Sequence, residues 1–541
     1  MSKTSKIFLF FLLLSGVLCS TTVIGQNNSM CWKDYSYIKH SQGWLTSENA
    51  VGLKALPLDN ISIVALSFQK GNGKLIDYYQ SDDFYNIGAN IESFYRLTPK
   101  IVLFGKMGYD NFQGKNMTGS AFINPNYTPF DILDYDAGTQ GSKKIENYHL
   151  IGAISADVYK GVILGGKIDF TAANYAKDKD LRHKNTLSDM KLSVGLNYKL
   201  NRFLDLGANY SYRRRNESVT FNTYGTSERL YNSLISYGAF MGKIASFEGT
   251  QGYTAESKGN PLFDEHHGVS IQINSELNSK ITLFNEFSYK NREGYFGKKA
   301  TSSIVYSKHN GTSLTYKGKL NIQQKKNLHT LAIQIEHEEL ENWENVYKIE
   351  KPLGEASSIV TYYDPLKMGD KEFFNAQVEY TANLQIKDFI PLWIVKAGIN
   401  FYQRKQTASI YPFYRKQTSN QTSFNLSGSR NFIKGKDLYS VSLGLNYTKG
   451  NGTPYEDGYY SQPSESQGSP ARLDDLLNKE YEFLTASCIL GNIGFKYAHL
   501  FPKLKIQGYT SINYSLSKAF NIKHLEGDNF NHLHIAIGCT F

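Results

Sequence analysis

Apolar and polar residues alternate with a period of two over most of this chain. From Lys191 to Leu200 the even positions carry Leu, Val, Leu, Tyr and Leu, while the odd positions carry Lys, Ser, Gly, Asn and Lys. The run from Phe203 to Tyr212 repeats the alternation, and only Asn201-Arg202 separates the two runs. A period of two predicts a β-strand with one apolar face, and two such runs joined by two residues predict an antiparallel hairpin.

The same hairpin unit recurs along the chain. Its short connections include residues 98–100, 160–161, 278–280, 325–327, 435–436 and 501–503. Longer polar, Tyr-rich segments separate the hairpins, at roughly residues 110–148, 171–190, 213–268, 290–311, 337–373, 403–422 and 449–483. A β-sandwich core would also alternate, but a regular succession of short turns and long loops favours an outer-membrane barrel.

The sequence therefore predicts an all-β protein, a closed antiparallel transmembrane β-barrel with short periplasmic turns and long extracellular loops. Counting the runs gives about eighteen strands, an even number as single-chain bacterial barrels require. Two runs leave the count open. Ile61–Phe68 is apolar on both faces, and the run around Cys488 changes phase near Gly491, where either a bulge or a strand break would fit. Sixteen strands is therefore the alternative.

The last strand runs to the final residue of the sequence. Its apolar row consists of Leu533, Ile535, Ile537, Cys539 and Phe541. Chain ends fray unless they are tied down, so we expect this strand to pair with the first one and close the cylinder. The row also resembles the C-terminal signal by which Gram-negative outer-membrane barrels are recognised, and that resemblance implies the outer-membrane assembly machinery as a partner.

The N-terminal residues predict export. Lys3 and Lys6 precede the apolar run Ile7–Leu18, and small or polar residues follow up to Gly25. The run is too short for a spanning helix, so residues 1–25 are predicted to be a signal peptide that is cleaved after Gly25. We expect residues 26–60 to form a periplasmic or lumen-inserted segment, too short for the plug domain of a TonB-dependent transporter. Residues 61–541 are expected to form the barrel.

Composition and charge fit this interpretation. The chain contains 39 Tyr and 32 Phe, residue types that form interfacial girdles, and a barrel's alternation explains the mean hydropathy of −0.41. The net charge is +10, and no nucleic-acid-binding motif accompanies it, so anionic lipid headgroups, lipopolysaccharide or anionic solutes are expected partners rather than nucleic acid. Cys31, Cys488 and Cys539 form no disulfide framework, zinc motif or redox motif. No cofactor is expected.

A short segment before the first strand carries a family resemblance. The residues concerned are Trp44, Ser47, Asn49, Ala50, Gly52 and Leu53, within the range 43–57. The segment resembles the entry segment of an uncharacterised outer-membrane barrel family of the Bacteroidota, often encoded beside TonB-dependent receptors. Similar residues occur at the start of fatty-acid-channel-like barrels. The resemblance implies an accessory role near nutrient or iron uptake and gives no reaction or site residues.

His532 and His534 share the inward face of the last strand. Same-face neighbours lie about 7 Å apart, so two imidazoles could hold one metal ion. The sequence provides no identifiable third ligand, and polar lumen residues are the alternative interpretation.

Two further runs combine carboxylates with His, namely Glu336–Glu339 and Asp264–His267. We place them at loop mouths, where they could bind a divalent cation or belong to a barrel hydrolase. Neither run has the spacing of a metalloprotease or a fixed nucleophile and base, so we expect these residues to be solvated loop charges.

Arg213, Arg214 and Arg215 follow a strand at its outer end. Guanidinium groups bind phosphate in a bidentate fashion, so these residues could contact lipopolysaccharide. Successive side chains of a strand alternate between its two faces, so only some of the three could do so. An ordinary polar loop start is the alternative.

These observations lead to two functional hypotheses and no enzyme. The first is a channel or accessory subunit for uptake of nutrients, iron or small anionic solutes beside a TonB-dependent receptor. The second is a loop-presenting surface adhesin or binding subunit with a plugged lumen. The alternation also predicts which side of each strand faces lipid. We therefore expect Leu196→Arg on the lipid side to lower folded stability by roughly 2–4 kcal/mol and Gly195→Arg on the lumen side to be tolerated better.

Overall fold

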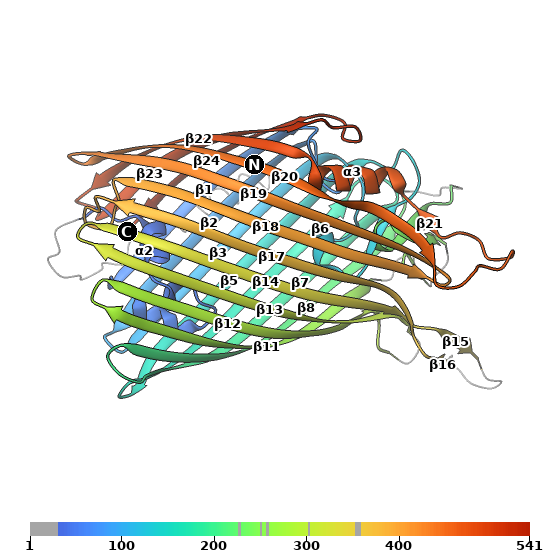
Figure 1. The fold of residues 1–541 in the computed structure, drawn as a ribbon, viewed down its shortest axis with the longest axis horizontal. Helices are drawn as coiled ribbons and strands as arrows, with labels where there is room; N and C mark the ends of the chain where they lie inside the picture. The colour runs from blue at the N-terminus through green and yellow to red at the C-terminus, as the bar shows by residue number, and fades with distance from the viewer. Residues whose placement is uncertain (1–30, 225–228, 249–251, 256–258, 301–302, 352–358) are drawn as a thin grey trace, which may run out of the picture.

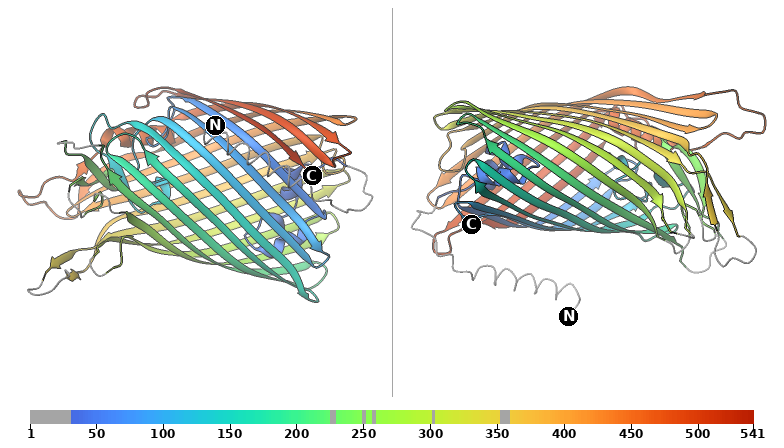
Figure 2. Two further views of the ribbon diagram at one scale, coloured as in Figure 1. Left: turned by 180° about the vertical axis from the view of Figure 1, so that it is seen from behind. Right: turned by 90° about the horizontal axis from the view of Figure 1, so that it is seen from below.

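The computed structural model describes residues 31–224, 229–248, 252–255, 259–300, 303–351 and 359–541. Within these ranges an 18-stranded antiparallel sheet runs from β1 (Asn60–Gly73) to β24 (Asn529–Thr540), and β24 pairs with β1. The sheet is therefore a closed barrel (Figures 1 and 2). The predicted fold class is confirmed, and the alternative of sixteen strands is wrong. The predicted signal peptide, residues 1–25, lies outside the described residues.

The barrel contains sixteen further strands between these two. They are β2 (Asp83–Thr98), β3 (Ile101–Met117), β5 (Gly141–Tyr159), β6 (Val162–Lys177), β7 (Arg182–Lys199), β8 (Leu204–Asn222), β11 (Asn260–Asn278), β12 (Ile281–Gly297), β13 (Val305–Gln324), β14 (Asn327–Glu344), β17 (Leu366–Leu384), β18 (Trp393–Ile410), β19 (Phe413–Lys434), β20 (Asp437–Tyr459), β22 (Ser487–Phe501) and β23 (Ile506–Phe520).

Smaller elements lie at the two ends of the barrel. At the short-turn end these are α2 (Tyr35–Ser41) and the 3-10 helices η1 (Trp44–Thr46) and η2 (Ala50–Ala55). At the other end a 4-stranded sheet consists of β4 (Asp131–Asp134), β9 (Asn232–Gly238), β10 (Met241–Ser246) and β21 (Ala471–Arg472), accompanied by η3 (Pro125–Tyr127), α3 (Asp474–Thr485) and the hairpin β15 (Tyr347–Glu350) and β16 (Ile359–Tyr362).

The C-terminal strand has a neighbour on each side. The N–H of Phe541 donates to the carbonyl of Ser62 at 3.0 Å, and the N–H of Ser62 donates to the carbonyl of Phe541 at 2.9 Å. Strand β24 also pairs with β23 along its length. The last residue is thus held by the first strand, which explains why the sequence can end on a strand without fraying.

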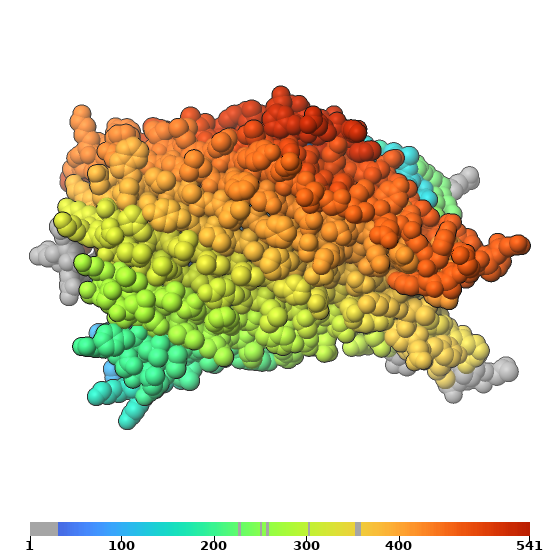
Figure 3. All heavy atoms as spheres, in the orientation of Figure 1, coloured from blue at the N-terminus to red at the C-terminus, as the bar shows by residue number. Residues whose placement is uncertain are grey.

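The predicted facing of the strands is confirmed. Leu196 is 42% exposed on the outer wall, whereas Ser193 and Asn197 of the same strand are buried on the inner side. The outer wall carries exposed apolar side chains all round the barrel. The space-filling view shows a continuous outer surface over the strands on this side (Figure 3). Hydrocarbon can cover such a surface at little free-energy cost. Its side chains are apolar, and the closed sheet has no edge strand with unpaired backbone N–H and C=O groups.

Three of the segments expected to be long loops consist largely of strand. Strands β6 and β7 are joined by residues 178–181, β12 and β13 by residues 298–304, and β18 and β19 by Tyr411-Pro412 alone. The hairpins extend beyond the apolar belt, where the outer face meets water and alternation disappears. Backbone pairing continues there without the sequence pattern that would reveal it.

Both ambiguous runs form regular strands. Strand β22 pairs with β20 and with β23 in continuous register, so the phase change near Gly491 is neither a bulge nor a break. The first strand is apolar on both faces because its inner residue Ile61 packs with Ile38 and Leu53 of the N-terminal segment.

None of the helices in the described ranges has the length and apolar character needed to cross a bilayer.

Candidate functional site

Residues 31–59, which we call the N-terminal plug, lie inside the short-turn end of the barrel (Figure 2). Helix α2 begins after Asp34, whose carboxylate accepts from the N–H of Tyr37 at 2.9 Å. The plug residue Glu48 accepts from Lys191 of β7 at 2.7 Å and from Lys290 of β12 at 3.0 Å. Burial alone would raise the pKa of the Glu48 carboxyl, but these two ammonium groups hold the pKa below its ordinary value.

The residues of the family resemblance fix the plug to the wall. The Trp44 ring packs edge-on against Phe284 at 5.1 Å, and Ser47 donates to Glu286 of β12. The Asn49 amide donates to the carbonyl of Ala208 at 3.1 Å and to Gln272 at 2.9 Å. These residues therefore hold the plug in place.

Two glycines of the wall make room for the plug. A Cβ on Gly195 would lie 1.9 Å from the Asn49 amide oxygen, and a Cβ on Gly165 would lie 2.5 Å from the backbone nitrogen of Val51. Any side chain at either position would displace this segment. The small inner-face residues thus mark where the plug sits, a signal that strand alternation alone does not reveal.

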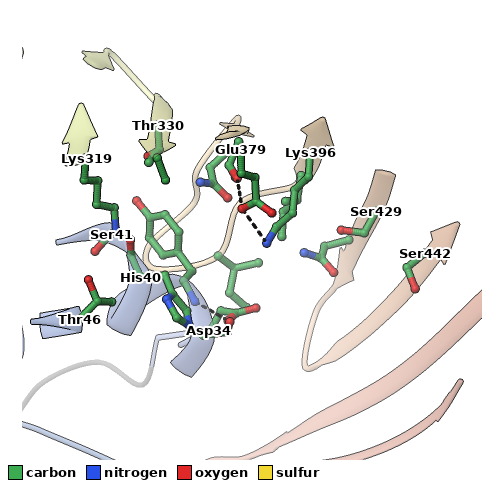
Figure 4. Close-up of a pocket in the computed structure, with 18 of the residues that line it drawn as sticks. Asp34, His40, Ser41, Thr46, Lys319, Thr330, Glu379, Lys396, Ser429 and Ser442 are labelled. Carbon is green, nitrogen blue, oxygen red and sulfur yellow. Dashed lines mark hydrogen bonds and ion pairs between the residues drawn. The ribbon is translucent and has the colours of Figure 1, made fainter. Parts of the chain in front are cut away.

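A polar cavity of about 1100 Å³ lies between the plug and the wall formed by β12 to β24. Figure 4 shows residues of the plug, among them His40 and Ser41, facing Lys319 and Lys396 on barrel strands. Thr330, Ser429 and Ser442 add hydroxyl groups to the same wall. The plug thus fills only one side of the lumen and leaves a hydrophilic space beside it.

Cations outnumber carboxylates around this cavity. Its charged lining consists of Lys33, Lys317, Lys319, Lys396 and Lys496 against Asp34, Glu286 and Glu379. The ion pairs among them are loose, at 3.6 Å for Lys396 with Glu379 and 3.9 Å for Lys317 with Glu286. Lys496 lies over the Tyr509 ring and has no carboxylate partner in the described part of the chain. Excess positive charge in a partly enclosed space favours an anion.

The opposite end of the lumen is closed by what we call the lid, residues 74–82, 118–140, 229–248 and 471–486. The carbonyl of Ser120 accepts from Lys143 of β5 at 2.7 Å, and the carbonyl of Thr128 accepts from Lys371 of β17 at 2.8 Å. Strands β5 and β17 lie nearly opposite each other in the ring. One lid segment therefore spans the mouth from wall to wall.

An apolar core joins the lid to the wall. Phe122, Phe130 and Ile132 pack with wall residues of β8, β11 and β12, and the Phe130 ring meets Phe296 of β12 at 5.1 Å. Helix α3 adds a buried ion pair, in which Arg404 of β18 donates to both carboxylate oxygens of Glu480 at 2.8 and 2.6 Å. The described lid segments are thus packed closely against the wall.

The two histidines of the last strand are not joined by a third ligand. His534 lines the polar cavity, and His532 lies 3.2 Å from the Gln69 side chain and 6.1 Å from the Phe84 ring. No cluster of three or more His, Cys, Asp or Glu side chains suited to a metal ion occurs in the part of the chain that the structure describes. The metal site stays a prediction without further support.

The outer face of the last strand is partly exposed. Ile537 and Phe541 are the exposed members of the row that also contains Leu533, Ile535 and Cys539. Their role as an assembly signal stays a prediction.

The side chains of the three successive arginines alternate between the two faces of β8, as strand geometry requires. Arg213 donates to both oxygens of Asp189 at 2.8 and 2.5 Å, and Arg215 pairs with Glu217 inside the barrel. Arg214 is exposed and lies over the Phe263 ring on the outer wall. The predicted lipopolysaccharide contact therefore narrows to Arg214, because the other two guanidinium groups are engaged internally.

Both carboxylate and histidine runs lie within strands rather than in loops. Asp264 of β11 is fully buried and lies 2.7 Å from Arg292 and from His309. His337 of β14 lies 3.4 Å from Glu372 of β17. The expectation of solvated loop charges is wrong for Asp264, which belongs to an internal ion-pair network below the lid.

Comparison with known proteins places the chain in a family. The model described as "Family of unknown function (DUF6850)" matches residues 50–541. A search of curated proteins finds no match.

Several solved structures are similar to this chain at low sequence identity. A mutant of the ferric enterobactin receptor PfeA from Pseudomonas aeruginosa has 10% identity and a TM-score of 0.39, covering 89% of this chain and 80% of that one. The ferric preacinetobactin receptor BauA from Acinetobacter baumannii has 8% identity and a TM-score of 0.38, with the same coverage. The CymD monoaromatic hydrocarbon channel has 9% identity and a TM-score of 0.29, covering 92% of each chain.

Proposed function

The chain belongs to the DUF6850 family, and we propose that it is a gated outer-membrane barrel that admits a small anionic solute. Its exposed apolar outer wall supports a place in a bilayer, and its short-turn end, with the plug, would face the periplasm. The Bacteroidota origin and the neighbouring TonB-dependent receptor implied by residues 43–57 remain predictions, as does export by a cleaved signal peptide.

The single observation that carries the proposal is the lysine-lined cavity beside the plug. A barrel that only presents loops has no need for an aqueous space of about 1100 Å³ with loosely paired lysines. The lid blocks the direct path from outside, so solute entry requires the lid to move. The closed lid and the polar cavity together correspond to the resting state of a gated pathway.

Reversal potentials in planar bilayers test this function. Under a KCl gradient we expect rare openings that select Cl⁻ over K⁺, because the cavity is positive. The double variant Lys396→Glu/Lys496→Glu should shift the reversal potential toward cation selectivity. Lys348→Glu/Lys351→Glu, in and beside the exposed β15, is the matched control and should leave selectivity unchanged.

The lid supplies a second test. Glu480→Gln weakens the buried pair with Arg404 and should increase the open time. Bilayers that stay closed with both the native protein and this variant would contradict the channel.

A second candidate function is a surface binding subunit with a plugged lumen. The observation that favours it is the apolar core of the lid, together with the exposed residues Ile359 and Tyr362 of the projecting β15–β16 hairpin. Closed bilayers combined with a co-purifying surface receptor would support this function over the channel. We propose no enzymatic activity, and a TonB-dependent receptor as partner is part of the proposal.

A further inference from the structure

The short-turn end of the barrel carries positive charge on every turn. Eight turns join the strand pairs at this end, and each contains at least one exposed Lys or Arg. The cations are Lys100, Lys160, Arg202, Lys280, Lys325, Lys326, Lys387, Lys436, Lys503 and Lys505. Asp388 is the only carboxylate in these same turns. Because successive hairpins follow one another round the closed sheet, the cations form a ring, which we call the basic rim.

The opposite end of the molecule shows no such bias. Cations there are mixed with carboxylates, and some form ion pairs, as in the pairs of Lys74 with Glu526 and Arg472 with Asp457. The loop between β23 and β24 is held by Glu482, which accepts from three of its backbone N–H groups. The basic rim is therefore a property of one end and does not simply follow from the net charge of the chain.

Aromatic side chains border the basic rim on the outer wall. The Arg202 guanidinium lies 4.4 Å from the Phe203 ring centroid, and Arg430, near the end of β19, lies 4.4 Å from that of Trp393. Tyr159, next to Lys160, is 78% exposed. Aromatic rings beside cations at the edge of an apolar belt are typical of the headgroup level of a bilayer.

We propose that the basic rim binds the phosphate groups of anionic phospholipids, such as phosphatidylglycerol, in the periplasmic leaflet. A single acidic protein would need its counterpart on one side of the mouth, whereas these cations are spread round the whole circumference at the edge of the belt. Each cation near an anionic surface adds attraction that salt weakens. The rim would fix the depth and tilt of the barrel and leave the plug accessible at its centre. The inference rests on the proposed membrane location.

Spin-labelled lipids provide the test. The protein is reconstituted in phosphatidylcholine vesicles that contain either spin-labelled phosphatidylglycerol or spin-labelled phosphatidylcholine, and electron spin resonance gives the motionally restricted fraction of each. We expect the native protein to prefer phosphatidylglycerol by about two-fold or more, and high salt to reduce that preference. The rim variant Lys325→Gln/Lys326→Gln/Lys503→Gln/Lys505→Gln should lose most of it. The matched control Lys298→Gln/Lys299→Gln/Lys348→Gln/Lys351→Gln removes the same charge at the other end and should keep it.

The possible results separate the alternatives. Equal affinity of the native protein for both lipids, or an unchanged preference in the rim variant, would overturn the proposal. Loss of the preference on adding inorganic phosphate, at an ionic strength where the same ionic strength of KCl leaves it intact, would identify a free-anion site in place of a headgroup site and would also overturn it. Rim-dependent retention on polyglutamate beads without any lipid preference would assign the rim to an acidic protein instead.

Flotation distinguishes this proposal from the one it rests on. In a sucrose gradient both the native protein and the rim variant should float with the vesicles. If neither floats, the membrane location itself fails, whereas flotation without lipid preference leaves the barrel in the membrane and removes only the lipid site.

Discussion

The two closures of the lumen differ in the balance between their polar and apolar contacts. The N-terminal plug meets β7 and β11 through polar contacts, such as Glu48 with Lys191 and Asn49 with Gln272. Its apolar contacts lie elsewhere, where Ile38 and Leu53 pack with Ile61 of β1. The lid meets its wall through an apolar core in which Phe130 and Ile132 are fully buried. A polar contact surface can be wetted and separated at modest cost, whereas an apolar core loses burial energy as soon as it opens.

The inward-facing residues of the wall beneath the plug also differ from those beneath the lid. Beneath the plug, the inward residues of β7 and β11 are polar or small, including Ser193, Gly195 and Gln272, whereas Ile61 of β1 is apolar. Beneath the lid, β8 turns Val219 and Phe221 inward. We therefore expect the polar contacts of the plug with β7 and β11 to separate more readily than the apolar core of the lid.

The largest effect is expected in the lid core. Phe130→Ala removes a fully buried ring that packs against Phe122, Tyr253 and Phe296, and should cost about 3–5 kcal/mol of local stability. Hydrogen exchange of residues 118–134 should accelerate while the barrel strands remain protected. Tyr127→Ala in the same segment is the control, because that ring is 56% exposed. Equal exchange in the two variants would show that the apolar core does not hold the lid.

The next effect concerns the outer wall. Leu196→Arg places a charge on the lipid-facing side and should lower folded stability by roughly 2–4 kcal/mol if the residue lies near the midplane. Folded yield in lipid, read from heat-modifiable gel mobility, gives the measurement. A yield equal to that of the native protein would contradict the facing of β7.

The neighbouring inner position requires a corrected expectation. Gly195 was expected to tolerate Arg because the lumen side offers space, but the Asn49 side chain occupies that space. Gly195→Arg should therefore fold as a barrel and expel the plug, so that a protease added at the periplasmic end cleaves within residues 31–59. A variant that protects the plug as well as the native protein does would refute the tight contact.

A smaller effect is expected at the ion pairs of the plug. Glu48→Gln leaves Lys191 and Lys290 without their carboxylate and should weaken the seat of the plug by roughly 1–3 kcal/mol. Hydrogen exchange within residues 44–55 measures the change. Asp59→Asn is the control, since that carboxylate is mostly exposed and only loosely paired with Arg96. Similar exchange in both variants would mean that Glu48 does not hold the plug.

The barrel was predictable because the alternation of apolar and polar residues that places each strand in the wall can be read within that single strand. Alternation in segments such as Lys191–Leu200 identifies the outer wall, and Phe541 identifies the closing strand. The extended hairpins, such as β18 with β19, escaped prediction because water on the outside and lid or lumen on the inside remove the apolar row. The strands of these extensions pair because the same strands are already in register within the apolar belt.

The lumen was less predictable because it depends on contacts between distant segments. Asn49 meets Gln272, and Arg404 meets Glu480, at sequence separations that no local pattern reveals. The sequence predicts that residues 26–60 lie in the periplasm or in the lumen, but it does not indicate the wall glycines that receive them. The cavity lysines lie on inward faces of separate strands and converge only when the barrel closes.

The smallest expected effect is the response of the lid to pH, which distinguishes it from the plug. Burial, and then the nearby Glu480, raise the pKa of Asp77 from 3.8 to about 8, and burial raises the pKa of Asp131 to about 6. The closed lid thus retains protons that exposed aspartates would release near pH 4. The stabilisation of the closed lid by these retained protons is fully present below about pH 4 and is lost as the pH rises through about 8.

Hydrogen exchange within residues 74–82 and 118–134, corrected for its intrinsic pH dependence, should therefore increase between about pH 5 and 8. Asp77→Asn should flatten the upper part of that rise, whereas Asp388→Asn at the far end should not. The plug should respond in the opposite sense, because the lowered pKa of Glu48 means that its ion pairs are lost only on strong acidification. A lid that tightened with rising pH would show that its buried aspartates are already ionised, and the contrast between an apolar, proton-holding lid and an ion-paired plug would then be wrong.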